Sequence, residues 1–100
     1  MPGTTRKLLT VVCEAGLESR LAKDVMRLGA HGYTVTDARG HGSRGARNAA
    51  WDTAANIRME VVCKERIAQR IAEHLRKHYY DNFAMILFSV DVEVLRPERF

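Results

Sequence analysis

Two stretches of helical periodicity, each flanked by strand-like segments, constrain the fold of this chain more than any other feature. The stretches span residues 14–29 and 65–80, and both repeat apolar residues every three or four positions. This spacing gathers the apolar side chains on one face of a helix, so each helix needs a layer to pack against. Gly29 suits the C-terminal cap of the first helix. The apolar repeats are Leu17, Leu21, Val25 and Leu28, then Ile67, Ile71, Leu75 and Tyr79.

Four segments around these helices have the composition or the alternation of strands. The third alternates most clearly, with Ile57, Met59 and Val61 on one side and charged residues on the other. The last is apolar on both faces at its start and alternates from Asp91. It predicts a strand that is buried at one end and half exposed at the other. The four segments cover residues 8–13, 33–38, 57–63 and 84–95.

The order strand, helix, strand, strand, helix, strand predicts an α+β fold of the ferredoxin-like βαββαβ type, in one domain of 100 residues. Two right-handed crossovers place both helices on one face of a four-stranded sheet. We expect the strands at 8–13 and 57–63 to be parallel central neighbours, and those at 33–38 and 57–63 to form an antiparallel hairpin. The face without helices needs a cover, which another subunit could supply, and a short chain favours such oligomerisation.

A long hairpin loop, residues 40–56, separates the second and third predicted strands. Together with Arg39 it holds three glycines, three arginines and one histidine against a single acid, Asp52. Glycine amides, the Ser43 hydroxyl and the guanidinium groups of Arg44 and Arg47 suit an anion such as phosphate. The loop lacks the ending of a standard phosphate-binding motif, so a solvated basic tip remains the alternative. Trp51 could anchor a partner or fold back on its own subunit.

Several other classes of function find little support in the sequence. The net charge of +4 favours anionic partners, but the strand IRMEVVCK has no stacking aromatic, so nucleic acid is not an expected partner. MPGTTRK does not have the pattern of a signal peptide, and no apolar run could span a bilayer. We therefore expect a cytoplasmic protein. Motifs for a catalytic nucleophile are also missing, which argues against an enzyme.

For the histidine, cysteine and aromatic residues the sequence favours structural roles. His74 and His78 have the spacing of metal ligands, but the sequence offers no third ligand, so we expect solvated histidines and no metal. Cys13 and Cys63 end strands that we expect to be neighbours. Burial as small apolar residues is the main expectation, and a redox pair stays open. Tyr79, Tyr80 and Phe83 are expected to close one end of the core.

The chain resembles the PII-like signalling proteins, in particular the SbtB-type and carboxysome-associated regulators. The resemblance runs from about Lys7 to Leu95. It implies a homotrimer with a nucleotide cleft between each pair of subunits, in which AMP or ADP binds, and bicarbonate is a second candidate ligand. The long hairpin corresponds to the T-loop, which would dock onto a partner such as a bicarbonate transporter. The segments that show the resemblance are GYTVTDARGHGSR from Gly32, then Arg47, NIRMEVV from Asn56 and YYDNFAMILFSVDVEVL from Tyr79.

By this resemblance the nucleotide site draws on several segments. The loop should line the phosphate end, Thr34 and Thr36 should approach the nucleoside, and the backbone at Met85 and Ile86 should meet the adenine. The implied residues are Thr34, Thr36, Gly40, His41, Gly42, Ser43, Arg44, Arg47, Met85, Ile86 and Arg96.

The chain also departs from the classical PII pattern. The loop has no tyrosine for uridylylation, and Tyr80 to Ala84 lacks the glycine- and lysine-rich phosphate loop, which favours AMP or ADP over a triphosphate with Mg²⁺. Met85 replaces a usual glycine. The alternative function is a small anion-binding or phosphate-transfer enzyme that uses the same basic loop. That enzyme would need a general base, for which the loop offers only Asp52 and His41.

Overall fold

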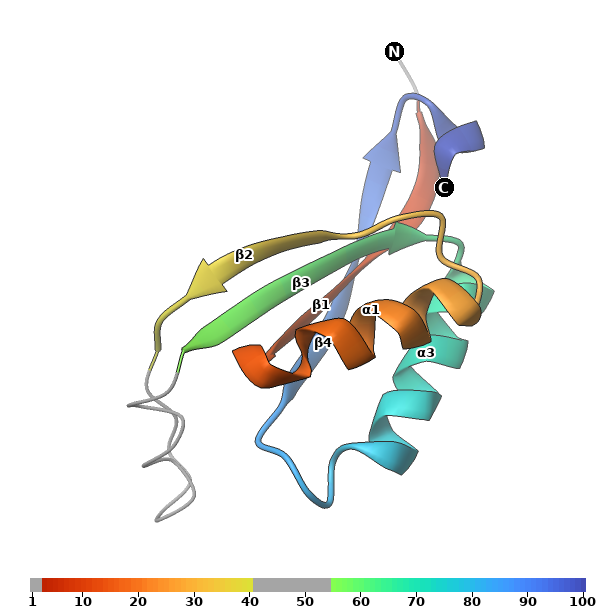
Figure 1. The fold of residues 1–100 in the computed structure, drawn as a ribbon. Helices are drawn as coiled ribbons and strands as arrows, with labels where there is room; N and C mark the ends of the chain where they lie inside the picture. The colour runs from red at the N-terminus through yellow and green to blue at the C-terminus, as the bar shows by residue number, and fades with distance from the viewer. Residues whose placement is uncertain (1–2, 41–54) are drawn as a thin grey trace.

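The computed structural model describes residues 3–40 and 55–100, and within these ranges two α-helices and four strands follow in the predicted order (Figure 1). The ferredoxin-like α+β prediction is confirmed. Short 3₁₀ helices precede the first α-helix at Ala15–Leu17 and follow the last strand at Pro97–Arg99. The main elements are β1 (Thr4–Glu14), α1 (Glu18–Arg27), β2 (Thr34–Ala38), β3 (Asn56–Cys63), α3 (Glu65–His78) and β4 (Ile86–Val94).

The strand order is β2-β3-β1-β4, and all three neighbouring pairs are antiparallel. The strands at 8–13 and 57–63 are central neighbours as predicted, but the prediction that they are parallel is wrong. Cys13 pairs with Ile57, whereas Cys63 pairs with Lys7. The crossover through α1 returns the chain in the direction of β1, and the hairpin then reverses it, so β3 runs against β1.

β1 begins at Thr4, four residues before the predicted start. The polar segment Thr4 to Lys7 has no strand pattern of its own, but it pairs with the end of β4, where Thr4 lies opposite Val94. Cys63 ends β3 opposite Lys7, so this part of β1 has β4 as its partner. The two strands extend together away from the helices as a narrow ribbon (Figure 1).

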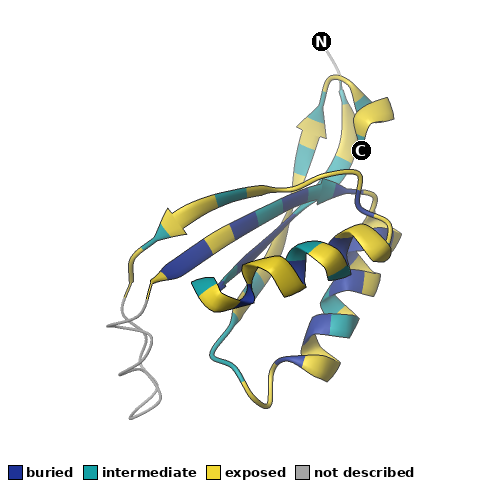
Figure 2. Cartoon of the chain, viewed as in Figure 1, coloured by how far each residue is buried: buried dark blue, intermediate teal, exposed yellow. Residues whose placement is uncertain are grey.

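Both described helices lie on the same face of the sheet, as predicted (Figure 1). Their predicted apolar stripes point inward, and buried residues follow β1, β3 and the inner sides of the helices (Figure 2). Leu28 is only partly buried, at the end of α1. Both helices of the described residues are too short and too polar to cross a membrane. The buried side chains that form the core are Leu9, Val11, Cys13, Leu17, Leu21, Val25, Ala30, Ile57, Met59, Val61, Cys63, Ile67, Ala68, Ile71, Leu75 and Tyr79.

In the described part of the chain no helix covers the other side of the sheet, which we call the open face. Its apolar side chains concentrate on β4, where Ile86, Phe88 and Val90 are 50%, 44% and 49% exposed. The start of β4 is therefore not buried as predicted, because β4 is an edge strand with one uncovered side. By strand register the open face includes Leu8, Thr10, Val12, Thr34, Thr36, Arg58, Glu60, Val62, Ile86, Phe88 and Val90, of which Thr10 is buried among its neighbours.

Candidate functional site

The base of the long hairpin lies at one end of the sheet, where Ala38 of β2 pairs with Asn56 of β3. Gly40 is exposed just beyond β2. On the other side of the hairpin, the carbonyl of Ala55 accepts a hydrogen bond of 2.9 Å from the backbone N–H of Ala15. This bond ties the start of β3 to the 3₁₀ turn before α1. The predicted residues His41, Gly42, Ser43, Arg44, Arg47 and Trp51 lie outside the described residues.

Thr34 and Thr36 lie on β2, where both residues belong to the open face. Thr34 is paired with Glu60, and Thr36 with Arg58. The Nε group of Arg58 donates to Oε2 of Glu60 at 3.3 Å. The edge of the sheet next to the hairpin thus presents two hydroxyl groups, one guanidinium and one carboxylate. These are groups that can bind the polar parts of a nucleoside.

Ile86 starts β4 at the same end of the sheet but on the opposite edge. It pairs with Val12, which pairs with Arg58, which pairs with Thr36. Three strand spacings of about 4.8 Å place Thr36 and Ile86 of one chain roughly 14 Å apart. Met85, beside Ile86, packs its half-buried side chain against the core. The β2 residues and the Met85–Ile86 backbone are therefore not brought together within one copy.

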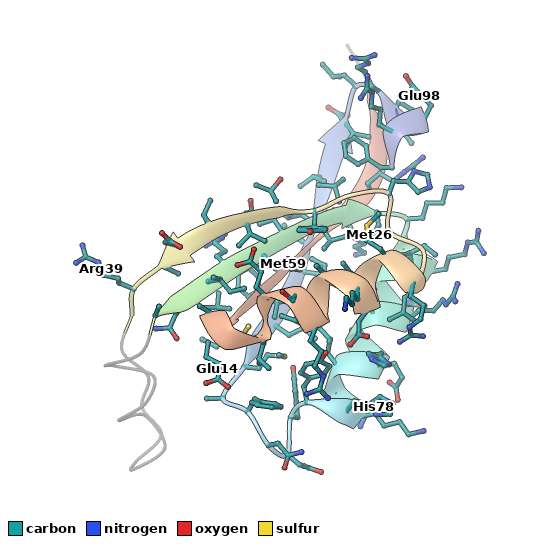
Figure 3. All side chains as sticks on the ribbon, in the orientation of Figure 1. Glu14, Met26, Arg39, Met59, His78 and Glu98 are labelled. Atoms are coloured by element: carbon teal, nitrogen blue, oxygen red, sulfur yellow. The ribbon has the colours of Figure 1, made fainter. Side chains whose placement is uncertain are left out.

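Arg96 lies at the other end of the molecule. It follows β4, is exposed, and its Nε lies 3.9 Å from Oε2 of Glu98. Figure 3 shows Glu98 near the C-terminus and Arg39 at the hairpin base, far apart along the long dimension of the protein. β4 rises about 3.3 Å per residue from Ile86 to Val94, so Arg96 stands more than roughly 25 Å from the other candidates. It does not reach them in the same chain.

A cluster of polar side chains between α1 and α3 was missed by the sequence analysis. Asp24 of α1 is its centre. Oδ2 of Asp24 accepts a hydrogen bond of 2.5 Å from the hydroxyl of Tyr79 and lies 3.1 Å from Nε2 of His74. A guanidinium nitrogen of Arg27 lies 3.5 Å from Oδ1 of Asp24. The guanidinium carbon of Arg20 stands 4.6 Å from the centre of the Tyr79 ring.

This cluster corrects two predictions. The prediction that His74 is solvated is wrong: its side chain is only 19% exposed because it packs against α1 and contacts Asp24. His78 is exposed as expected, at the end of α3 (Figure 3). Of the aromatic residues expected to close the core, Tyr79 is fully buried and Phe83 packs against the core, whereas Tyr80 is exposed. Tyr80 follows the end of α3, and its side chain leaves the apolar stripe.

Burial and hydrogen bonding in this cluster shift the pKa values of Asp24 and Tyr79 in opposite directions. Burial alone would raise the pKa of Asp24, but hydrogen bonds from Tyr79 and His74 favour the carboxylate and lower it overall. Burial raises the pKa of Tyr79, and the bond to the Asp24 carboxylate raises it further. The arrangement thus holds an ionised carboxylate against a neutral phenol.

The two thiols lie at opposite ends of the β1–β3 pair, because the strands are antiparallel. Ile57, the partner of Cys13, is six residues from Cys63, which is about 20 Å along a strand. A disulfide within one chain requires Cα atoms less than about 7 Å apart, so the redox pair is excluded. Both thiols are free and buried. Burial raises the pKa of Cys13 to about 12 and also raises that of Cys63, which makes them poor nucleophiles.

The part of the chain that the structure describes contains no cluster of side chains that could coordinate a metal ion. Across residues 3–40 and 55–100, no group of three or more histidine, cysteine, aspartate or glutamate side chains is arranged to hold an ion.

Comparison with known proteins identifies relatives over nearly the whole chain. The model of a family described as nitrogen regulatory protein P-II matches residues 6–99. A solved structure from Thermus thermophilus, described as a PII-like signaling protein, is 44% identical, with a TM-score of 0.85. That match covers 100% of this chain and 99% of the other.

Structures of the protein CPII from Thiomonas intermedia are more distant and show likeness of fold alone. One, bound to ADP, AMP and acetate, is 20% identical with a TM-score of 0.81, covering 100% of this chain and 98% of that one. Another, bound to ADP and bicarbonate, is 22% identical with the same TM-score, covering 97% and 95%.

Proposed function

The chain belongs to the family of nitrogen regulatory proteins P-II, and from this premise we propose that it is a non-enzymatic signal transducer that binds AMP or ADP. The proposal takes the nucleotide to lie between subunits of a homotrimer. One observation carries it: the residues implied in binding lie on opposite edges of one sheet, Thr34 and Thr36 on β2 and Ile86 at the start of β4. A second copy is needed to bring such edges together.

The open face supports assembly as well. Ile86, Phe88 and Val90 are each about half exposed, which is unusual for three apolar side chains in one row of a strand. Another copy that covers this row would remove the apolar area from water. Arg96, at the far end of its own chain, would then act in a site shared with a neighbour.

The choice of ligand rests on the loop and on the distant relative. Gly40, His41, Gly42, Ser43, Arg44 and Arg47 supply amide, hydroxyl and guanidinium donors for phosphate. CPII, which shares this fold, binds ADP, AMP and bicarbonate. We propose AMP or ADP as the principal ligand and bicarbonate as a second one, with a role in regulating bicarbonate uptake or carboxysome-linked carbon metabolism. The partner would be a bicarbonate transporter that is contacted by the hairpin and Trp51. Two free thiols fit a cytoplasmic protein.

Calorimetric titration with AMP, ADP, ATP and adenosine, followed by product analysis, tests the proposal. We expect AMP or ADP to bind without turnover, and more tightly than adenosine. Release of phosphate or transfer of a phosphoryl group would instead support the enzyme. Absence of binding by all four ligands would reject nucleotide sensing. Repeating the ADP titration with and without bicarbonate tests the second ligand, which should change the measured affinity for ADP.

The hairpin is proposed as the element that changes with the ligand. Bound phosphate would gather Arg44 and Arg47 at the base, offsetting part of the backbone ordering entropy of about 1–2 kcal/mol per residue. Residues 49–55 gain no such contact, so we expect the ligand to leave them unchanged and only a bound partner to order them. Hydrogen exchange with and without AMP should therefore show new protection at residues 40–47 and little change around Trp51. Equal exchange at residues 40–47 in both states would remove the switch from the proposal.

A further inference from the structure

The turn from α3 to β4 is built on Tyr79. The backbone carbonyl of Tyr79 accepts hydrogen bonds from the N–H groups of Asn82 at 3.1 Å and of Phe83 at 3.0 Å. The backbone N–H of Tyr79 in turn donates to the carbonyl of Leu75 at 2.9 Å. Tyr79 therefore closes α3 and also fixes the path of the turn that follows it.

The side chain of Tyr79 is held by α1. Its ring is fully buried, and its hydroxyl donates to Oδ2 of Asp24 at 2.5 Å. Arg20, one helical turn before Asp24, places its guanidinium carbon 4.6 Å from the centre of the Tyr79 ring and 5.9 Å from that of Phe83. The Tyr79 and Phe83 rings are 6.0 Å apart. α1 thus contacts both the first and the last residue of the turn.

The same turn leads directly to the backbone proposed to meet adenine. Phe83 is followed by Ala84, Met85 and Ile86, and the side chain of Met85 rests on the core. The 3₁₀ turn that leads into α1 is joined to the hairpin base by the bond from Ala15 to Ala55. Together, this turn and α1 therefore contact both chain segments that flank the proposed nucleotide site.

We propose that Asp24 and Tyr79 are positioning residues of the nucleotide site: their hydrogen bond fixes residues 80–85 and so places the backbone of Met85 and Ile86 against the adenine. This inference rests on the proposed function. It goes beyond it by assigning a role in base recognition to two side chains that do not touch the ligand. The hydrogen bond joins α1 to the turn that leads to the site. Loss of this bond therefore loosens the turn while the buried ring of Tyr79 stays in place.

Tyr79→Phe is the sharpest test, because it removes one hydroxyl and keeps the ring. Tyr80→Phe is the matched control, because it removes the same atom from the exposed neighbouring tyrosine. Without nucleotide, hydrogen exchange of residues 80–86 should be faster in Tyr79→Phe than in the wild type or in Tyr80→Phe. Asp24→Asn, which keeps an acceptor but loses the charge, should give a smaller change in the same direction.

Binding separates positioning from a merely structural role. A charge-assisted hydrogen bond at the ligand itself is worth roughly tenfold or more in affinity, so an indirect effect should weaken AMP by roughly three- to tenfold. GMP, whose base edge does not match a backbone arranged for adenine, should bind Tyr79→Phe and the wild type alike. The selectivity for AMP over GMP should therefore fall, and Tyr80→Phe should keep it.

Three results would overturn the inference. Unchanged exchange of residues 80–86 in Tyr79→Phe would mean that the hydrogen bond does not hold the turn. Equal losses for AMP and GMP would mean that Tyr79 supports the fold and not base recognition. Unchanged AMP affinity would separate the turn from the ligand. In these cases nucleotide binding by the wild type still supports the proposed function, whereas a wild type that binds neither nucleotide rejects both.

Discussion

Gly29 lies directly against Ile67. A Cβ atom on Gly29 would stand 2.8 Å from Cδ1 of Ile67. Gly29 also has a φ of 121°, a backbone conformation that residues with a side chain rarely adopt. The residue follows the C-cap of α1, and its lack of a side chain lets the end of α1 approach the start of α3. The glycine at this position is therefore required both by backbone conformation and by packing.

Gly29→Ala should destabilise the protein by about 1–3 kcal/mol, because the alanine must adopt a strained backbone and displace Ile67. Urea unfolding measures the change. Gly16→Ala is the control, because nothing lies within 4 Å of a Cβ at that position. Similar losses in the two variants would show that the contact with Ile67 is not what selects glycine.

Phe88→Glu should disrupt self-association, because it places a charge in the apolar row of β4 that the proposed assembly covers. Met26→Glu is a matched control, since both side chains are 44% exposed but Met26 lies on α1, away from the open face. Light scattering at micromolar concentration should report a trimer for the wild type and for Met26→Glu, and a smaller species for Phe88→Glu. A monomeric wild type would contradict the proposed trimer.

Arg44→Ala or Arg47→Ala should weaken AMP or ADP binding by roughly ten- to a hundredfold, because charge-assisted bonds to phosphate are worth roughly 1.5–3 kcal/mol each. Adenosine, which has no phosphate, should bind as before. Arg66→Ala removes an exposed arginine from α3 and should change neither affinity. Calorimetry decides the matter: parallel losses for adenosine and AMP would assign these arginines to the fold instead of the phosphate.

Asp24→Asn should lower stability at pH 7 by about 1.5 kcal/mol or more, because the hydrogen bonds from Tyr79 and His74 lose a charged acceptor. The hydrogen bonds outweigh burial and depress the folded pKa of Asp24. Its contribution to stability is therefore fully present above the unfolded pKa and is lost as pH falls from there through the folded pKa. The difference from the wild type should therefore shrink below about pH 4. Denaturant titrations between about pH 7 and 3 measure it, with the exposed Asp37→Asn as control. A difference that is constant with pH would mean that charge is not involved.

Periodicity predicted the elements well because it reflects burial on one side. The stripe Ile67, Ile71, Leu75 and Tyr79 is buried throughout, and so are Ile57, Met59 and Val61. The first four residues of β1 could not be found in this way. Thr4 to Lys7 are in a strand because β4 supplies the partner, which is a tertiary effect that overrides local preference.

Relations between distant segments were harder to predict. β3 runs antiparallel to β1 because the hairpin reverses the chain after β2. The prediction that β1 and β3 are parallel did not take this reversal into account. No spacing links Asp24 to His74 and Tyr79, which are 50 and 55 positions away, so the cluster between the helices had no sequence signature. The chemistry of the loop pointed to an anion at Ser43, Arg44 and Arg47, and only the resemblance made that anion a nucleotide. Both steps remain predictions.

The exposed row on β4 has a consequence for the newly made chain. Before the proposed assembly forms, each polypeptide carries a nine-residue edge strand with three half-exposed apolar side chains. Such an edge is also a template for uncontrolled pairing with other strands. Productive encounters between copies and aggregation then compete for the same surface, and the encounter rate falls steeply as the chains become scarce. If the trimer forms as proposed, slow synthesis leaves single copies exposed for longest, and the yield of the trimer depends on how quickly copies are produced near one another.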